Sequence, residues 1–268
     1  MLKDVTLGQY FPGNSPIHRL DPRTKLICLT AYIVVLFMAP SWISFTVVFA
    51  FLVTAVVLSR IPLKSLASGM KPLVFVLVFT GILNVFFYKG TNIALEFWVI
   101  KIYWEGVLQA FLMVWRILML ISGTFLLTYT TSPIALTDGL ESLLSPLKKL
   151  HLPVHELAMM MCIALRFIPT LIEETDKIMS AQKARGADFE NGNLLQRVKA
   201  LVPILVPLFI SAFRRADELA TAMECRCYQG GDGRTKMKLL RYKLLDFKAF
   251  FVCLLLVVTV VTLFMFGL

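Results

Sequence analysis

The chain has 268 residues, of which 58% are hydrophobic and 16% are charged, whereas an ordinary soluble domain is about 45–50% apolar and about 25% charged. This composition excludes a water-soluble globule, and the mean hydropathy of +0.76 excludes a disordered chain, because disorder requires few apolar residues and high charge. The formal net charge is +10, but no nucleic-acid-binding motif accompanies it, so we expect the lipid bilayer, and no nucleic acid, as the partner of this charge.

Uncharged stretches predict where the chain crosses the membrane. Residues 1–25 are basic and are expected to form a cytoplasmic amino-terminal segment, because Lys and Arg collect on the cytoplasmic side. Residues 26–130 are expected to hold four membrane-spanning helices. The first two share the uncharged residues 26–58, which are too long for one span of a hydrocarbon core about 30 Å thick and contain Pro40 as a break.

The third and fourth spans are expected at residues 72–88 and 106–130. The residues between them, 91–104, partly alternate between apolar and other side chains, which favours an external hairpin or an interfacial segment. A fifth span is expected over residues 249–268, which would leave the carboxyl terminus outside the cell. The predicted fold class is therefore an all-α integral membrane protein with about five transmembrane helices.

Residues 131–248 are expected to form a cytoplasmic or interfacial coupling domain of long helices. Two stretches within it, residues 157–168 and 200–213, are apolar but too short or too interrupted to be comfortable spans. Each continues into a charged helical tail. The pattern predicts long helices with one end against the membrane and the other end in water.

Each charged tail ends in an arginine between two small residues. Ala184-Arg185-Gly186 ends the first tail and Cys225-Arg226-Cys227 ends the second. Arginine in a last turn complements the helix dipole, and glycine beyond it favours a left-handed cap, so ordinary helix capping would account for either tripeptide alone. Small neighbours also leave the guanidinium open to carboxylates or carbonyls of a partner. These six residues are the candidate coupling site.

Two further arginines lie within apolar stretches. Arg116 interrupts the fourth predicted span, and Arg166 lies in residues 157–168. An arginine near the centre of a span costs about 2.5–3.5 kcal/mol on insertion scales, so a structural or intramembrane role is expected for it. Pairing with a carboxylate or with helix-end carbonyls, snorkelling, and a pore lining all remain open.

Catalytic and metal-binding patterns are incomplete in this sequence. The glycine-rich residues 230–235 fail the phosphate-loop spacing, because the position five residues before Gly233 is Tyr228 and Arg234 replaces the required lysine. His155-Glu156 lacks the second histidine of a zinc protease, since that position holds Met159. We therefore expect no catalytic residue, no metal and no cofactor in this chain.

Taken together, these segments resemble the transmembrane T component of energy-coupling factor (ECF) transporters, which are micronutrient importers of the ABC class. The resemblance runs almost from end to end. It rests on Gly8-Gln9-Tyr10, Ser15-Pro16-Ile17-His18-Arg19-Leu20-Asp21-Pro22-Arg23-Thr24-Lys25, Leu165-Arg166-Phe167-Ile168-Pro169, Ala181-Gln182-Lys183-Ala184-Arg185-Gly186, Ala222-Met223-Glu224-Cys225-Arg226-Cys227-Tyr228 and Gly230-Gly231-Asp232-Gly233-Arg234-Thr235.

The resemblance implies a non-catalytic subunit in the cell membrane. It implies that Arg185 and Arg226 each engage one of two ABC-type ATPase subunits, which would bind ATP and magnesium, and that the apolar faces of the coupling helices hold a membrane-embedded S component that binds the vitamin or metal ion. The second tripeptide departs from the usual Ala-Arg-Gly of the family in having Cys225 and Cys227 beside the arginine. A membrane permease that binds substrate itself, and a membrane-embedded enzyme, remain as alternatives.

Overall fold

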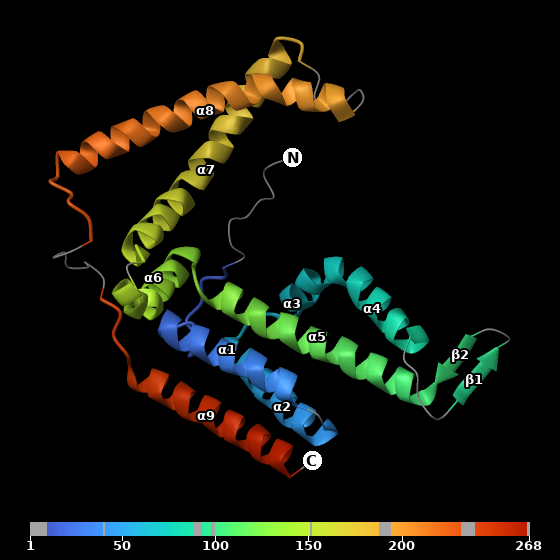
Figure 1. Ribbon diagram of the computed structural model, residues 1–268. Helices are drawn as coiled ribbons and strands as arrows, with labels where there is room; N and C mark the ends of the chain where they lie inside the picture. The colour runs from blue at the N-terminus through green and yellow to red at the C-terminus, as the bar shows by residue number, and fades with distance from the viewer. Residues whose placement is uncertain are drawn as a thin grey trace. The chain divides into compact units, whose positions relative to one another are not determined.

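The computed structural model describes residues 10–39, 41–87, 93–97, 100–150, 152–187, 194–231 and 239–266, and Figure 1 shows their course. These residues are almost entirely helical, as predicted. The elements in chain order are α1 (Pro22–Met38), α2 (Trp42–Ser59), α3 (Leu63–Met70), the short 3-10 helix η1 (Lys71–Leu73), α4 (Val74–Phe87), β1 (Ile93–Phe97), β2 (Ile100–Tyr103), α5 (Trp104–Thr130), α6 (Pro133–Leu144), η2 (Ser145–Leu150), α7 (Val154–Ala184), α8 (Leu194–Glu224) and α9 (Leu244–Met265).

The two short strands are the one departure from an all-helical chain among the described residues. β1 and β2 pair antiparallel, with Glu96 opposite Lys101. They fall within residues 91–104, where the sequence favoured an external hairpin or an interfacial segment. The hairpin is confirmed, and its position relative to the membrane stays a prediction.

The chain divides into two compact units. Of the described residues, the core unit holds those within 10–139 and 240–266, and the α7/α8 unit holds those within 140–239. One boundary falls within α6, and the other falls shortly before α9. The assignment of residues 1–25, 26–130, 131–248 and 249–268 to cytoplasm or membrane stays a prediction.

Five helical segments of the described chain are long and apolar enough to cross a membrane: α2, α3 together with α4 (Leu63–Phe87), α5, α7 and α9. The expected number is confirmed, but the set differs in two places. α1 has only 17 residues, and α7 qualifies because it continues as one helix on both sides of the apolar residues 157–168.

The hydrophobic core of the core unit lies between α1, α2, α5 and α9, which are side by side in Figure 1. Leu36 and Val48 are fully buried there. The Tyr32 hydroxyl donates a hydrogen bond to the Met119 carbonyl of α5 at 3.0 Å. A side chain at Gly123 would come within 2.7 Å of the Tyr32 ring, so the close approach of α1 and α5 requires glycine at this position.

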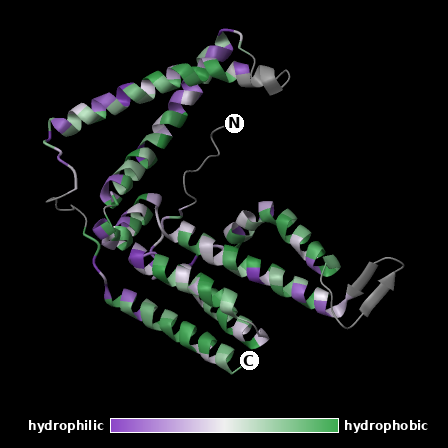
Figure 2. Cartoon of the chain, in the orientation of Figure 1, coloured by the Kyte–Doolittle hydropathy of each residue, from purple (hydrophilic) through white to green (hydrophobic). Residues whose placement is uncertain are grey.

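Many apolar side chains of these helices face outward. Figure 2 shows hydrophobic residues around most of the surface of α2, α5 and α9, and large apolar residues such as Phe251 and Val57 are more than 60% exposed. A helix that is hydrophobic on all sides belongs in a protein core or a membrane. Lipid is therefore the surrounding of the core unit.

Polar contacts tie three helix ends together at one end of the core unit. The fully buried Asp246 accepts hydrogen bonds from the backbone N–H of Asp21 at 2.8 Å and of Lys243 at 2.7 Å. The Lys25 ammonium donates to the Thr130 carbonyl at 2.9 Å and to the Thr131 hydroxyl at 3.1 Å. The segment 15–25 therefore joins the start of α1 to the start of α9 and the end of α5.

The Asp246 contacts predict the effect of removing its charge. Asp246→Asn replaces an acceptor oxygen with a donor facing a backbone N–H, and leaving a buried donor unsatisfied costs about 1–3 kcal/mol. We expect a lower thermal unfolding midpoint in detergent than for the wild-type chain. The exposed Asp217 supplies the matched control, and an equal loss in Asp217→Asn would contradict this account.

Candidate functional site

The candidate coupling residues lie at the carboxyl ends of α7 and α8, two helices that pack against each other. Glu174 of α7 accepts a hydrogen bond from the Ser211 hydroxyl and an ion-paired hydrogen bond from Arg215 at 3.0 Å. Farther along α7, the Gln182 side-chain amide donates to the Pro203 carbonyl at 3.5 Å, which is long for a hydrogen bond. Because residue numbers rise along one helix and fall along the other, the helices cross in opposite directions.

Pro207 explains why the Pro203 carbonyl is open to Gln182. In an α-helix the carbonyl of residue 203 would accept from the N–H of residue 207, but proline has no N–H. α8 nevertheless continues as one helix through both prolines. The carbonyl left without its helical donor is the one to which Gln182 donates, so a local defect in α8 becomes a contact between the two helices.

The end of α7 is closed by a left-handed cap. Gly186 has a φ of +87°. Its N–H donates to the Lys183 carbonyl at 3.0 Å, and the N–H of Ala187 donates to the Gln182 carbonyl at 3.0 Å. This pair of bonds is the Schellman motif, which satisfies carbonyls that the last helical turn leaves open. The cap places Arg185 at the tip of the helix.

The end of α8 repeats the same cap with a different residue. Cys227 has a φ of +54°, and its N–H donates to the Glu224 carbonyl at 2.8 Å. The N–H of Tyr228 donates to the Met223 carbonyl at 3.0 Å. Cys227 thus takes the position of Gly186, although a non-glycine residue in this conformation costs roughly 1–2 kcal/mol. Arg226 is presented as Arg185 is, despite different neighbours.

All six residues of the two tripeptides are exposed. Of the described residues, none forms a hydrogen bond or an ion pair with the Arg185 or Arg226 guanidinium. The structure does not bring the two tripeptides together. Arg185 lies just beyond the contact at Pro203, and Arg226 lies 23 residues (226 − 203) farther along α8, which is about 35 Å at about 1.5 Å per residue.

Arg116 has a structural partner in the core unit. Its guanidinium donates to the Ala39 carbonyl at 3.0 Å, at the end of α1, and lies 5.0 Å from the centre of the Phe45 ring. This geometry fits pairing with a helix-end carbonyl, one of the alternatives that the sequence left open. Arg166 is exposed on α7 and has no hydrogen bond or ion pair with any described residue.

Sequence reasoning missed a contact at the start of α7. The His155 ring nitrogen Nδ1 lies 3.0 Å from Glu141 Oε1, and a side chain at Gly231 would overlap the His155 ring. The segment that follows α8 therefore returns to the first turn of α7. The Gly230-Gly231 pair was the sequence feature that could have predicted this close contact. Within the described ranges, no group of three His, Cys, Asp or Glu residues could hold a metal ion.

Comparison with known proteins decides the family. The model of the CbiQ family, described as cobalt transport protein, matches residues 13–237 and so includes both tripeptides. The chain belongs to this family. The relative from Thermosediminibacter oceani, called energy-coupling factor transporter transmembrane protein EcfT, is 56% identical over 249 residues, covering 93% of this chain and 94% of that protein.

Two further relatives carry the same name. The protein from Ruminiclostridium cellulolyticum is 53% identical over 246 residues, covering 92% of each chain. The protein from Bacillus subtilis is 50% identical over 238 residues, covering 89% of this chain and 90% of that protein. These findings confirm that this family member is a transmembrane component of an ECF transporter, as its sequence motifs predicted.

The two caps make opposite predictions for substitution. An added methyl at Gly186 would meet no atom within 4 Å, so the cost of Gly186→Ala is that of the left-handed backbone, about 1 kcal/mol. We expect amide exchange in the last turn of α7 to accelerate about fivefold, measured by hydrogen–deuterium exchange of its terminal peptide. Cys227→Gly relieves the same cost and should slow exchange at the end of α8. Unchanged exchange in both variants would contradict the cap assignment.

Proposed function

We propose that this chain is the non-catalytic coupling subunit of an ABC-type micronutrient importer. Two ATPase subunits bind and hydrolyse ATP with magnesium, one engaging Arg185 and the other Arg226. Their movement shifts α7 and α8, and a membrane-embedded S component seated on these helices reorients and releases its substrate inside the cell. The observation that carries this proposal is the pair of exposed arginines on matching caps of two ion-paired helices.

Two separate ATPase contacts fit the spacing of the tips. A distance of about 35 Å along α8 is too great for one groove to hold both guanidinium groups. An exposed guanidinium presents a planar fork of donors to carboxylates or carbonyls of a partner. Each tip therefore suits its own groove, and two copies of one ATPase, or two related ATPases, would supply the grooves.

The crossing of α7 and α8 suits transmission of movement between the tips. Glu174 binds both Ser211 and Arg215, and Gln182 binds the Pro203 carbonyl, so contacts exist at two places along the helix pair. A push on either tip would act on a helix held at two points. We infer that α7 and α8 move together and not independently of each other.

The exposed apolar side of α8 is the proposed seat of the S component. Its apolar residues recur every four positions, and Figure 2 shows hydrophobic residues along the middle of the helix, with more hydrophilic ones toward Arg226. An exposed apolar surface of this extent marks an interaction site for a protein or a membrane, and a membrane-embedded S component would supply such a contact. Its members are Leu201, Val202, Leu205, Val206, Phe209, Ile210 and Phe213, all at least 45% exposed.

The proposed orientation places the amino terminus in the cytoplasm and the carboxyl terminus outside. Arg19, Arg23 and Lys25 precede or begin the first apolar run, and basic residues near a span favour the cytoplasmic side. α9 carries no charge after Lys248 and would cross once to the outer face. The coupling tips then meet ATPases in the compartment that supplies ATP.

Charge reversal at the tips tests the coupling role. Arg185→Glu and Arg226→Glu should each weaken assembly with the ATPase subunits roughly 30-fold or more, as expected when one partner of a hydrogen-bonded charge pair is lost. The double variant should abolish ATP-driven uptake in proteoliposomes. Arg214→Glu, at an exposed arginine within α8, is the control. Normal assembly and uptake in the double variant would overturn the proposal.

The thiols beside Arg226 provide a second measurement. Cys225 and Cys227 are free and exposed, so we expect alkylation of both to slow when the ATPase subunits assemble with the wild-type chain. In Arg226→Glu the thiols should stay reactive in the same mixture. Protection that is unaffected by Arg226→Glu would place the ATPase contact elsewhere.

Substitution on the apolar side of α8 tests the S-component seat independently. Phe209 is 61% exposed, so Phe209→Glu should leave the chain folded and still able to assemble with the ATPases, because a charge on an exposed position costs little by itself. Co-purification of the S component should be lost. Phe209→Leu keeps the surface apolar and should retain it, and equal retention in both variants would exclude this face.

A further inference from the structure

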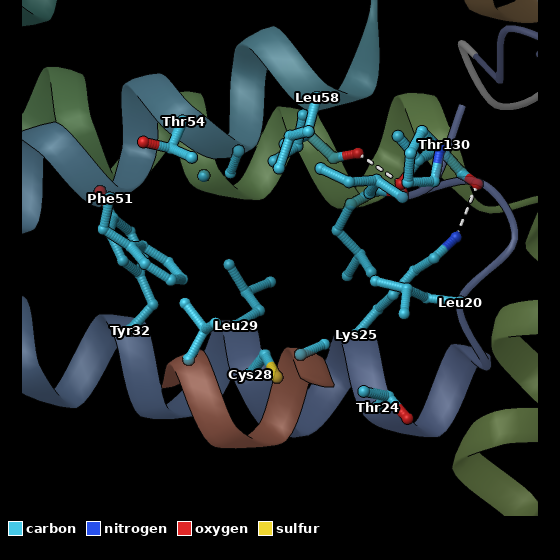
Figure 3. Close-up of a pocket in the computed structure, with 18 of the residues that line it drawn as sticks. Leu20, Thr24, Lys25, Cys28, Leu29, Tyr32, Phe51, Thr54, Leu58 and Thr130 are labelled. Atoms are coloured by element: carbon cyan, nitrogen blue, oxygen red, sulfur yellow. Dashed lines mark hydrogen bonds between the residues drawn. The ribbon is translucent and has the colours of Figure 1, made fainter. Parts of the chain in front are cut away.

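A cavity of about 300 Å³ lies within the core unit. α1, α2, α5 and α9 line it together with residues 16–20, and most of the lining is apolar, including Leu29, Phe51, Leu58 and Leu126. Figure 3 shows Tyr32 and Phe51 at one end, with Leu58 extending from α2 toward α1. The cavity lies between helices that lipid surrounds, so acyl chains are the molecules next to its opening.

The charged side chains that line the cavity are both basic. They are Lys25 at the start of α1 and Lys248 near the start of α9, and no Asp or Glu is among the described residues of the lining. The Lys25 ammonium donates to Thr130 and Thr131, as Figure 3 shows for Thr130. Lys248 is exposed and forms no hydrogen bond or ion pair with any described residue.

The two acids closest to these lysines in sequence bind other groups, and the Asp21 carboxylate pairs with Arg23 at 3.2 Å. Asp246 is fully buried, and its two oxygens accept from the N–H groups of Asp21 and Lys243. The basic end and the aromatic end are separated along α1 by the seven residues from Lys25 to Tyr32, or about 10 Å. The cavity is therefore elongated, with a cationic end and an apolar end.

We propose that this cavity is a binding site for an anionic phospholipid. The lipid phosphate lies at Lys248, within the field of Lys25, and one acyl chain runs past Leu29 and Leu58 toward Phe51. Basic pockets between transmembrane helices on the cytoplasmic side commonly bind anionic headgroups. A partner helix is excluded by size, because a helix with its side chains is about 10 Å across and does not fit this volume.

The bound chain would fill the space between α1, α2 and α5. Tyr32 and Phe51 stack with ring centres 6.1 Å apart at one end of it, and the polar ties of Lys25 close the other end. This site concerns the core unit and uses neither tripeptide. It stands or falls separately from the coupling role proposed above.

Photolabelling in defined bilayers tests the site. The full-length chain is reconstituted in phosphatidylcholine bilayers that contain a small fraction of a photoreactive lipid, which carries a diazirine on its acyl chain. This photoreactive lipid is phosphatidylglycerol in one sample and phosphatidylcholine in the other. We expect phosphatidylglycerol to label cavity residues several-fold more than phosphatidylcholine. Lys248→Gln should remove most of this preference, because one lysine near anionic lipid contributes roughly a fivefold effect, and Lys248→Glu should reverse it.

A larger side chain that fills the cavity provides a second test of the site. Leu58→Trp should reduce labelling by both lipids, whereas Val57→Trp, at an exposed neighbouring position outside the lining, should leave it unchanged. Lys64→Glu controls for charge reversal at another exposed lysine. Only variants whose thermal unfolding midpoint equals that of the wild-type chain are compared. Equal labelling by the two lipids, or a degree of labelling that neither Lys248→Glu nor Leu58→Trp changes, would show that the label comes from non-specific surrounding lipid. Either result would overturn the proposal.

Discussion

The structure depends on satisfying helix ends where water is scarce. The first N–H groups and last carbonyls of every helix lack partners within the helix, and an unpaired group in an apolar surrounding is costly. In the core unit charged side chains meet this need: Lys25 at the end of α5, Asp246 at the start of α1, and Arg116 at the end of α1. Because each partner comes from a distant part of the sequence, capping also fixes which helices are neighbours.

The α7/α8 unit meets the same requirement through its backbone. Both helices end in a left-handed residue that returns two N–H groups to the last turn. In this arrangement the adjacent arginine side chains form no hydrogen bond with any described residue. In the core unit, by contrast, the charged side chains that cap helix ends are already hydrogen-bonded to them. The contrast separates two uses of basic residues: those that hold the core unit together, and those that remain available to partners.

Substitution of glycine by cysteine at the second cap sharpens this interpretation. Cys227 keeps the backbone geometry of Gly186 at a conformational cost. The bonds on both sides of it are as short as those of the first cap. The backbone conformation and the exposed arginine are therefore what the two ends share, and the identity of the flanking residues is secondary to them.

The sequence by itself determined the solvent, the helical class and the family motifs. Long uncharged runs are sufficient for this, because a bilayer accepts only segments that satisfy their own backbone. It also located both arginine tips, since Arg and Gly signals at a helix end are local. It did not identify Arg215 as the partner of Glu174, or Asp246 as the partner of Asp21, because these contacts join residues 41 (215 − 174) and 225 (246 − 21) positions apart.

Tertiary structure alone decided the remaining features. Arg116 left several roles open in the sequence, and packing of α5 against the end of α1 gave it the Ala39 carbonyl. The cavity beside Lys248 arises from four helices that are separate in sequence. Local patterns carry propensity and charge, whereas cavities and long-range pairs exist only once the helices are packed.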